Sequence, residues 1–321
     1  MKVQLVKVHG SGNTFYLYEA LYDDKLDFVN MAKQLCDPSI NGGADGLLLV
    51  LPSDIADAKM RVINADGSEA SMCGNGLRCV ARHVCEKLEV DEALIETMHA
   101  CLAVKKEAPI FEQLPTYSVE ISPISFELSS LPMFLEDKLE LHHERIPAFS
   151  EEIPFTAVSV PNPHLIGIVD KKYIENTSHQ QQLAAFLNSD NDYCPDGVNV
   201  SYVLPISNNE IFVRTYERGV GFTNACGTAM TASALISIME NIVSDNLITV
   251  YNPGGFVQCS VTQYNDKWTL ALIGNATIVG YYDIEYIGNK IEFINCVMSE
   301  EQVQYDKCNI FAENKLISIT K

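Results

Sequence analysis

Residues 64–79 read Asn-Ala-Asp-Gly-Ser-Glu-Ala-Ser-Met-Cys-Gly-Asn-Gly-Leu-Arg-Cys, and this stretch decides the fold because it leads from an expected strand through glycines into an expected helix. Its first cysteine, Cys73, lies at the turn, shortly before the helical pattern of residues 77–88. Residues 215–229 repeat the arrangement, with Cys226 at the corresponding turn. Two copies of one strand, turn and helix predict two similar halves that face one site.

The composition is that of a globular protein with room for two domains. The chain has 321 residues, 47% of them hydrophobic, and a formal net charge of -20. This charge repels phosphate backbones and anionic lipid, so we expect no nucleic-acid partner and no membrane partner. No apolar run is long enough to span a bilayer, and the chain enters strand-like alternation at Val3 without a signal peptide. We therefore expect a cytoplasmic protein.

The chain has ten cysteines, which in the cytoplasm are reduced rather than paired in disulfides. Cys73, Cys79 and Cys85 are spaced by six residues, which spreads them around a helix instead of bringing them to one metal ion. We expect no metal site. Apart from Cys73 and Cys226, the cysteines are interpreted as small buried hydrophobic residues.

The order of strand-like and helical segments divides the chain into similar halves, and the least periodic stretch lies near residues 122–152. We place an N-terminal domain at residues 1–130 and a C-terminal domain at residues 131–282. Residues 283–321 form a C-terminal extension that can return to the N-terminal domain.

The chemistry is expected at the two Cys-Gly turns. The first turn of a helix has unpaired backbone N-H groups and the positive end of the helix dipole. A thiol placed there can have a pKa lowered from ~8.5 to ~3.5–7.5, and the N-H groups can hold a carboxylate. Two thiols beside one carboxylate suit removal of an α-proton on one face and delivery of a proton on the other, with the N-H groups stabilising the developing charge.

This is racemisation or epimerisation of an amino acid without a cofactor. A pyridoxal enzyme would need a lysine Schiff base and a loop that binds the cofactor phosphate. We found no glycine-rich phosphate loop in the sequence, so we expect no cofactor.

The motifs resemble those of the diaminopimelate epimerase family. They comprise residues 64–69 with 73–79, residues 217–221 with 225–228, the tripeptide at 162–164, and Gly-Val-Asn-Val at 197–200. The resemblance implies an α/β fold of the α+β type, with two pseudo-symmetric domains that each wrap a curved mixed sheet around a central helix. It places the active site in the interdomain cleft. It implies an isomerase that converts LL-2,6-diaminopimelate to the meso isomer for lysine and peptidoglycan synthesis, and we expect a homodimer.

The resemblance also implies roles for single residues. Cys73 and Cys226 become the catalytic acid and base, and His164 and Glu217 lie near the reacting carbon as further catalytic residues. The remaining site residues bind the substrate, through polar side chains or through backbone N-H groups that hold the reacting carboxylate: Asn13, Asn64, Gly74, Asn75, Asn162, Asn199, Arg218, Gly227 and Thr228. Arg218 suits a carboxylate because its guanidinium can donate two parallel hydrogen bonds.

Two other functions stay open on the sequence alone. One is racemisation or isomerisation of another amino acid on the same fold. The other is a redox-switched binding protein in which Cys73 and Cys226 form a reversible disulfide. His164, taken without its motif, is more often a structural histidine.

Overall fold

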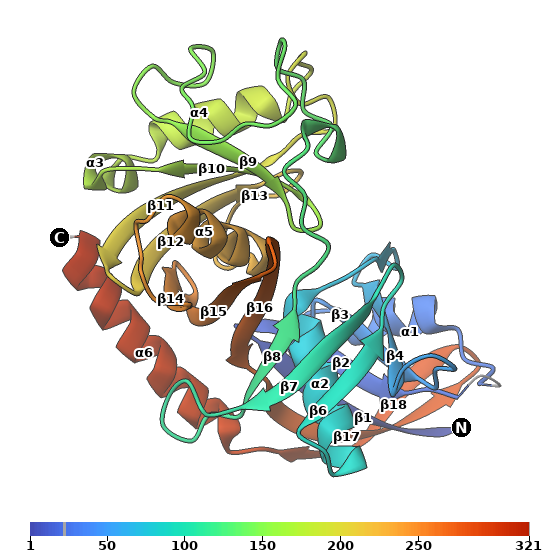
Figure 1. Ribbon diagram of the computed structural model, residues 1–321. Helices are drawn as coiled ribbons and strands as arrows, with labels where there is room; N and C mark the ends of the chain where they lie inside the picture. Colours follow the sequence, from blue (N-terminus) through green and yellow to red (C-terminus); the bar gives the residue numbers. More distant parts are fainter. Residues whose placement is uncertain (22–23, 321) are drawn as a thin grey trace. The chain divides into compact units, whose positions relative to one another are not determined.

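The computed structural model describes residues 1–21 and 24–320 (Figure 1). The chain forms two compact units, which we call unit 1 and unit 2. Unit 1 comprises Met1–Glu120 and Ile273–Cys308, and unit 2 comprises Ile121–Leu272 and Asn309–Lys321. The domain limits at residues 130 and 282 stay a prediction.

Unit 1 is built from strands around one long helix. Its described residues include the helices α1 (Phe28–Leu35) and α2 (Gly74–Leu88), and the final helix, α6 (Glu301–Thr320), begins in this unit. Its strands are β1 (Lys2–Gly10), β2 (Asn13–Glu19), β3 (Gly46–Leu51), β4 (Ala58–Asn64), β5 (Glu69–Ala70), β6 (Glu92–Glu96), β7 (Cys101–Glu107), β8 (Thr116–Glu120), β17 (Thr277–Ile287) and β18 (Lys290–Met298).

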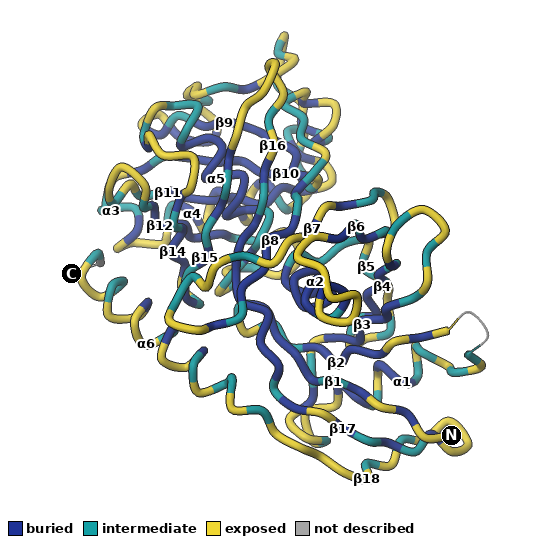
Figure 2. Tube along the Cα trace, turned by 60° about the horizontal axis from the view of Figure 1, so that its bottom comes forward, coloured by how far each residue is buried: buried dark blue, intermediate teal, exposed yellow. Residues whose placement is uncertain are grey.

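Pairing in unit 1 follows a fixed order. The hairpin β1–β2 is antiparallel, β2 runs parallel to β3, and β4 is antiparallel to both β3 and β5. Strand β4 then runs parallel to β6, β6 pairs antiparallel with β7, and β7 pairs antiparallel with β8. Helix α2 contacts β1 to β4 and β6 to β8, so the sheet curves around it. Most of α2 is buried, as Figure 2 shows.

Unit 2 contains the helices α3 (Lys171–Glu175), α4 (Ser178–Leu187) and α5 (Gly227–Met239), and the short 3-10 helix η1 (Leu128–Ser130). Its strands are β9 (Phe155–Ser159), β10 (Pro163–Ile168), β11 (Asn199–Ser207), β12 (Glu210–Glu217), β13 (Gly221–Thr223), β14 (Leu247–Asn252) and β15 (Gly255–Tyr264). Strand β16 (Lys267–Asn275) begins in unit 2, and its residues from Ile273 belong to unit 1.

The pairing in unit 2 repeats that of unit 1. Strands β9–β10 are antiparallel, β10 runs parallel to β11, and β12 is antiparallel to β11 and β13 and parallel to β14. Helix α5 contacts β9 to β12, β14 and β15. It is apolar on all sides and buried over nine of its residues, as a helix inside a curved sheet must be. The expected fold of two pseudo-symmetric halves, each with a central helix, is confirmed.

The C-terminal segment continues the sheet of unit 1. Strand β17 runs antiparallel to β1, and β18 pairs with β17. The start of α6 is fixed by Glu301, whose carboxylate accepts from Arg82 Nη1 and Nη2 at 2.6 and 2.8 Å and from the Ile278 backbone N-H at 2.8 Å. These bonds attach α6 to α2 and β17 within unit 1.

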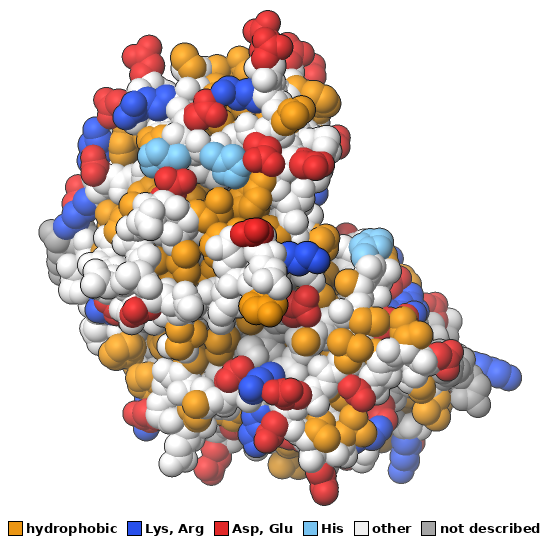
Figure 3. All heavy atoms as spheres, viewed as in Figure 1, with side chains coloured by type: hydrophobic (Ala, Val, Ile, Leu, Met, Phe, Trp, Pro, Cys, Tyr) orange, Lys and Arg blue, Asp and Glu red, His pale blue; other side chains and the backbone are white. Residues whose placement is uncertain are grey.

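Acidic side chains are spread over the face shown in Figure 3, singly or beside basic ones, which agrees with an interpretation of the acidic residues as solvated surface. Within residues 1–21 and 24–320, no helix is long and apolar enough to cross a membrane.

Candidate active site

Cys73 caps the N-terminus of the central helix of unit 1. Its backbone is extended, with φ -143° and ψ 110°, and its Sγ accepts from the Gly76 backbone N-H at 3.5 Å. Gly74 and Asn75, predicted to bind the reacting carboxylate, are the first two residues of α2. The N-H groups of a first helical turn have no partner inside the helix. The capping thiol therefore lies among backbone donors.

Asn13 lies beside this thiol at the start of β2. Its Oδ1 is 3.6 Å from Cys73 Sγ, and its Nδ2 donates to Asp45 Oδ2 at 2.7 Å. The parallel pairing of β2 with β3 brings Asp45, the residue before β3, to this position. Asn64 ends β4 in register with Gly46 and donates to Ser68 Oγ at 2.9 Å.

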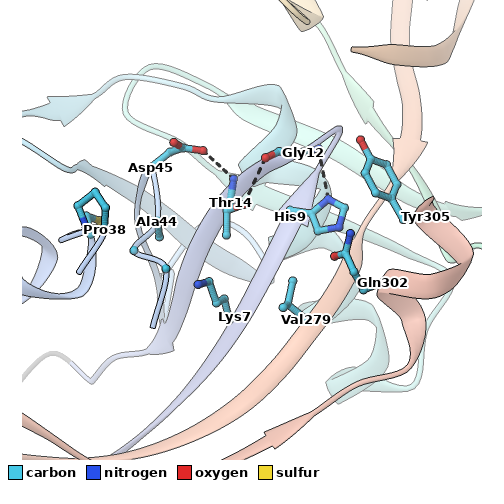
Figure 4. A pocket seen from close by; sticks show the side chains of 13 residues that line it. Lys7, His9, Gly12, Thr14, Pro38, Ala44, Asp45, Val279, Gln302 and Tyr305 are labelled. Atoms are coloured by element: carbon cyan, nitrogen blue, oxygen red, sulfur yellow. Dashed lines mark hydrogen bonds between the residues drawn. The ribbon is translucent and has the colours of Figure 1, made fainter. Parts of the chain in front are cut away.

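Asp45 also lines a cavity of about 440 Å³, whose lining residues all belong to unit 1. Figure 4 shows Pro38, Ala44 and Asp45 toward one end of it, Tyr305 at the other, and Thr14 and His9 between them. Lys7 also lines this cavity, and its Nζ donates to the Asn41 carbonyl at 2.7 Å. Asp45 itself is exposed.

Arg78 holds the start of α2 in place and is fully buried. Its Nη2 donates to Asn75 Oδ1 at 3.1 Å and to Ser11 Oγ at 2.9 Å, and its Nε donates to the Asn275 carbonyl at 3.1 Å. The turn between β1 and β2 approaches α2 closely, because a Cβ at Gly10 would lie 2.7 Å from the Asn75 carbonyl oxygen. Only glycine fits there without moving the helix start.

Cys226 has the equivalent place in unit 2. It caps α5 with φ -123° and ψ 109°, so Gly227 and Thr228 begin the helix. Its Sγ lies 3.5 Å from Thr228 Oγ1. Gly227 leaves room for the core, since a Cβ on it would lie 2.7 Å from Leu272 Cδ2.

His164 lies next to this cap and is completely buried on β10. Its Nε2 is 2.9 Å from Asn162 Oδ1 and 3.1 Å from Thr228 Oγ1, while Nδ1 is buried without a hydrogen-bond partner. Burial lowers the pKa of His164 to about 3, and the nearby Arg218 charge adds to this effect. The imidazole is therefore neutral at physiological pH.

Glu217 is the last residue of β12, and Arg218 comes directly after it. The Glu217 carboxylate accepts from Thr223 Oγ1 at 2.5 Å, so β13 supplies its partner. The Arg218 backbone N-H donates to Asn199 Oδ1 at 3.0 Å, and its Nη1 donates to the Asp196 carbonyl at 3.0 Å. Asn199 is in register with His164 across the parallel pair β10–β11.

Comparison with known proteins shows the family of the chain. The family model described as diaminopimelate epimerase matches residues 5–105 and 156–279. A diaminopimelate epimerase of Listeria welshimeri is 47% identical over 319 residues, which is 95% of this chain and 95% of that protein. One of Enterococcus faecalis is 44% identical over 320 residues, covering 96% of this chain and 98% of that protein. The chain belongs to the diaminopimelate epimerase family.

Like its relatives in the diaminopimelate epimerase family, the chain is an isomerase. Solved structures extend the likeness at the level of the fold alone. A PhzF-family phenazine biosynthesis protein of Bacillus anthracis superposes with a TM-score of 0.63 at 14% identity, covering 89% of this chain and 99% of that one. A probable proline racemase of Agrobacterium radiobacter does so with a TM-score of 0.54 at 15% identity, covering 87% and 92%.

One expectation for this member of the diaminopimelate epimerase family was wrong, namely the direction of the pKa shifts of the two thiols. We expected the helix starts to lower both values. Instead, burial raises the pKa of the Cys73 thiol, against the N-H groups of Gly76 and Asn75 and the Arg78 charge. Burial likewise raises the pKa of Cys226 to about 12, and the Glu217 carboxylate adds to the effect. Removal of the sulfur from water outweighs the helix terminus, because a thiolate loses its hydration.

The structure thus assembles the predicted site residues into two groups. Unit 1 brings Asn13, Gly74 and Asn75 to Cys73. Asn64 lies on β4, which β3 separates from Asn13 on β2. Unit 2 brings His164, Asn162, Thr228 and Glu217 to Cys226, with Asn199 and Arg218 next to Glu217. Sequence reasoning missed Asp45, Arg78 and Thr223, which bind site residues through contacts made only in the fold. Among the residues that the structure describes, no cluster of His, Cys, Asp and Glu is able to hold a metal ion.

Proposed function

We propose that this chain epimerises LL-2,6-diaminopimelate to meso-2,6-diaminopimelate by proton transfer between two cysteines, without a cofactor. One observation carries the proposal: Cys73 and Cys226 cap equivalent central helices of two equally paired sheets. Each unit thus offers a thiol beside the free N-H groups of a helix start. One thiolate removes the α-proton while the other thiol gives a proton to the opposite face of the carbon.

The raised thiol pKa values support this chemistry. The α-proton of an amino acid is weakly acidic, and a thiolate of high pKa is a stronger base than one that ionises easily. Donors fixed before the reaction then stabilise the carboxylate as charge develops on it. Among these donors we propose the backbone N-H groups of Gly74, Asn75, Gly227 and Thr228.

The neutral His164 contributes positioning rather than charge. Its Nε2 hydrogen can be donated to Asn162 Oδ1, which leaves the Thr228 hydroxyl hydrogen free to bind Cys226 Sγ. Glu217 lies close enough to Cys226 to raise the thiol pKa, and we propose that it receives the α-ammonium group of the substrate. We assign the other polar groups of the substrate, particularly those of its distal end, to the remaining polar side chains: Asn13, Asn64, Asn162, Asn199 and Arg218.

We test the function by α-deuterium incorporation. Purified, cofactor-free protein is incubated with LL-diaminopimelate in deuterated water, and deuterium at the α-carbon is followed by NMR. Cys73→Ala and Cys226→Ala should each slow turnover by about 10²- to 10⁴-fold, the usual contribution of a general acid or base. Cys101→Ala, at a partly buried cysteine on β7, is the matched control. No exchange by the unmodified protein refutes the function, and exchange of other amino acids instead would point to a different racemase.

We also propose that the protein acts in the cytoplasm as a homodimer and binds no nucleic acid. The free state of all ten cysteines supports a reducing compartment. Exposed apolar side chains on β18, among them Ile294, Val297 and Met298, support association with a second copy.

A further inference from the structure

Asp45 occupies a fixed position beside the Cys73 cap, although it lies in a loop. Its backbone N-H donates to the Thr14 carbonyl at 2.8 Å, and its carbonyl accepts from the Ala65 N-H at 3.1 Å. Its Oδ2 accepts two bonds, from Asn13 Nδ2 at 2.7 Å and from the Thr14 backbone N-H at 2.8 Å. Backbone and side chain are therefore both held, on the loop that leads into β3.

These contacts decide which way the Asn13 amide faces. A carboxylate has only acceptor oxygens, so it binds the NH₂ end of an amide and excludes the carbonyl end. With Nδ2 taken by Asp45, Oδ1 is the atom that faces Cys73 Sγ, at 3.6 Å. A carbonyl oxygen accepts a hydrogen bond from a thiol and repels a thiolate. The Asp45–Asn13 pair therefore favours Cys73 with its proton.

We propose that Asp45 is a positioning residue for the epimerisation: its carboxylate turns the Asn13 carbonyl oxygen toward the thiol, so that Cys73 is the proton donor of the resting enzyme. This inference rests on the proposed function. In the forward step, the S-H bond of Cys73 breaks as a C-H bond forms at the α-carbon. The proton removed from the opposite face goes to Cys226, and exchange with solvent restores the starting state.

The negative charge of Asp45 also favours the protonated form of the Cys73 thiol. It raises the pKa of Cys73, whereas the buried Arg78 lowers it. Asp45 acts on Cys73 through space by its charge and through Asn13 by the orientation of the amide, so a substitution at Asp45 changes both. In Asp45→Asn both changes lower the Cys73 pKa, because the negative charge is lost and Asn13 is free to present its NH₂ group to a thiolate.

The first readout is the reactivity of Cys73, which does not depend on turnover. Alkylation by iodoacetamide is measured against pH, and the tryptic peptide of residues 62–78 reports it because Cys73 is its one cysteine. We expect Cys73 to be alkylated faster in Asp45→Asn than in the unmodified protein at neutral pH. The matched control is Asp37→Asn, since Asp37 Oδ1 likewise accepts from a backbone N-H and a hydroxyl, both of Ser39, at 2.8 and 2.7 Å.

The second readout is the pH profile of kcat/KM for diaminopimelate. We expect Asp45→Asn to lower kcat/KM on the order of 10- to 100-fold and to move the profile to lower pH, whereas Asp37→Asn leaves both unchanged. If the Cys73 alkylation profile of Asp45→Asn overlays that of the unmodified protein, the proposal is wrong even if turnover falls. If the unmodified protein does not epimerise diaminopimelate, the proposed function fails instead, while alkylation still tests the link from Asp45 to Cys73.

Discussion

Thr228→Val tests how unit 2 controls the Cys226 thiol. Thr228 Oγ1 lies 3.5 Å from Cys226 Sγ and lowers the pKa of this thiol, opposing burial and Glu217. The substitution removes the hydroxyl at nearly constant side-chain size. His164 keeps Asn162 Oδ1 as a partner at 2.9 Å, so no buried group is left without a hydrogen bond by this change.

The expected magnitude follows from the bond that is lost. A hydrogen bond to a charged group contributes about 1.5–3 kcal/mol, and the sulfur contact is long, so we take about 1.5 kcal/mol. This corresponds to roughly tenfold less Cys226 thiolate at a given pH. Because the substitution raises the Cys226 pKa, activity should fall at neutral pH and recover as pH rises.

The assay is the rate of α-deuterium incorporation into diaminopimelate across neutral and alkaline pH. Thr231→Val is the control, since Thr231 Oγ1 donates to the Gly227 carbonyl at 2.9 Å, close to the first turn of the same helix. A loss in Thr228→Val that is the same at every pH, or a profile identical to that of Thr231→Val, would refute the role given to this hydroxyl.

Two further predictions concern unit 1. Gly10→Ala places a Cβ 2.7 Å from the Asn75 carbonyl oxygen, so unfolding in urea should show a loss of about 1–3 kcal/mol, and unchanged stability would contradict the close approach at the Cys73 helix. Glu301→Ala removes the carboxylate that binds both Nη atoms of Arg82 and leaves Glu86 as the remaining ion-pair partner, so it should cost about 1.5–3 kcal/mol in the same measurement. The neighbouring exposed Glu300→Ala should cost almost nothing, and equal losses in both variants would argue against the Arg82 pair.

Much of the fold was predictable because the decisive signals are local. The strand expected to lead into the Cys73 turn and the helix expected at residues 77–88 are confirmed as β4 and α2. The helix begins at Gly74, earlier than expected, because apolar periodicity does not reveal a first turn of glycine and asparagine. Strand β6 (Glu92–Glu96) was missed, since its ends are acidic and its buried face is only two residues, Ala93 and Ile95.

The site was predictable in its residue types but not in its electrostatics. The Cys-Gly turns indicated two caps, and both are present at Cys73 and Cys226. The direction of both thiol pKa shifts was predicted wrongly, because the helix start is visible in sequence and the desolvation of the sulfur is not. Asp45 gave no signal, since an aspartate in a glycine-rich loop is typical of turns.

By itself, the sequence determined the two strand–turn–helix segments and the position of one cysteine at the turn of each. Helix caps and turns depend on residues that are close together in the chain. Only the tertiary structure decided how strongly each thiol is withdrawn from water and that Asp45 holds Asn13, a residue 32 positions away. The physical reason is that hydration and side-chain orientation are set by whichever distant segments pack against a group. The stretch at residues 64–79 specifies where the Cys73 thiol lies, and the surrounding sheet sets its charge state.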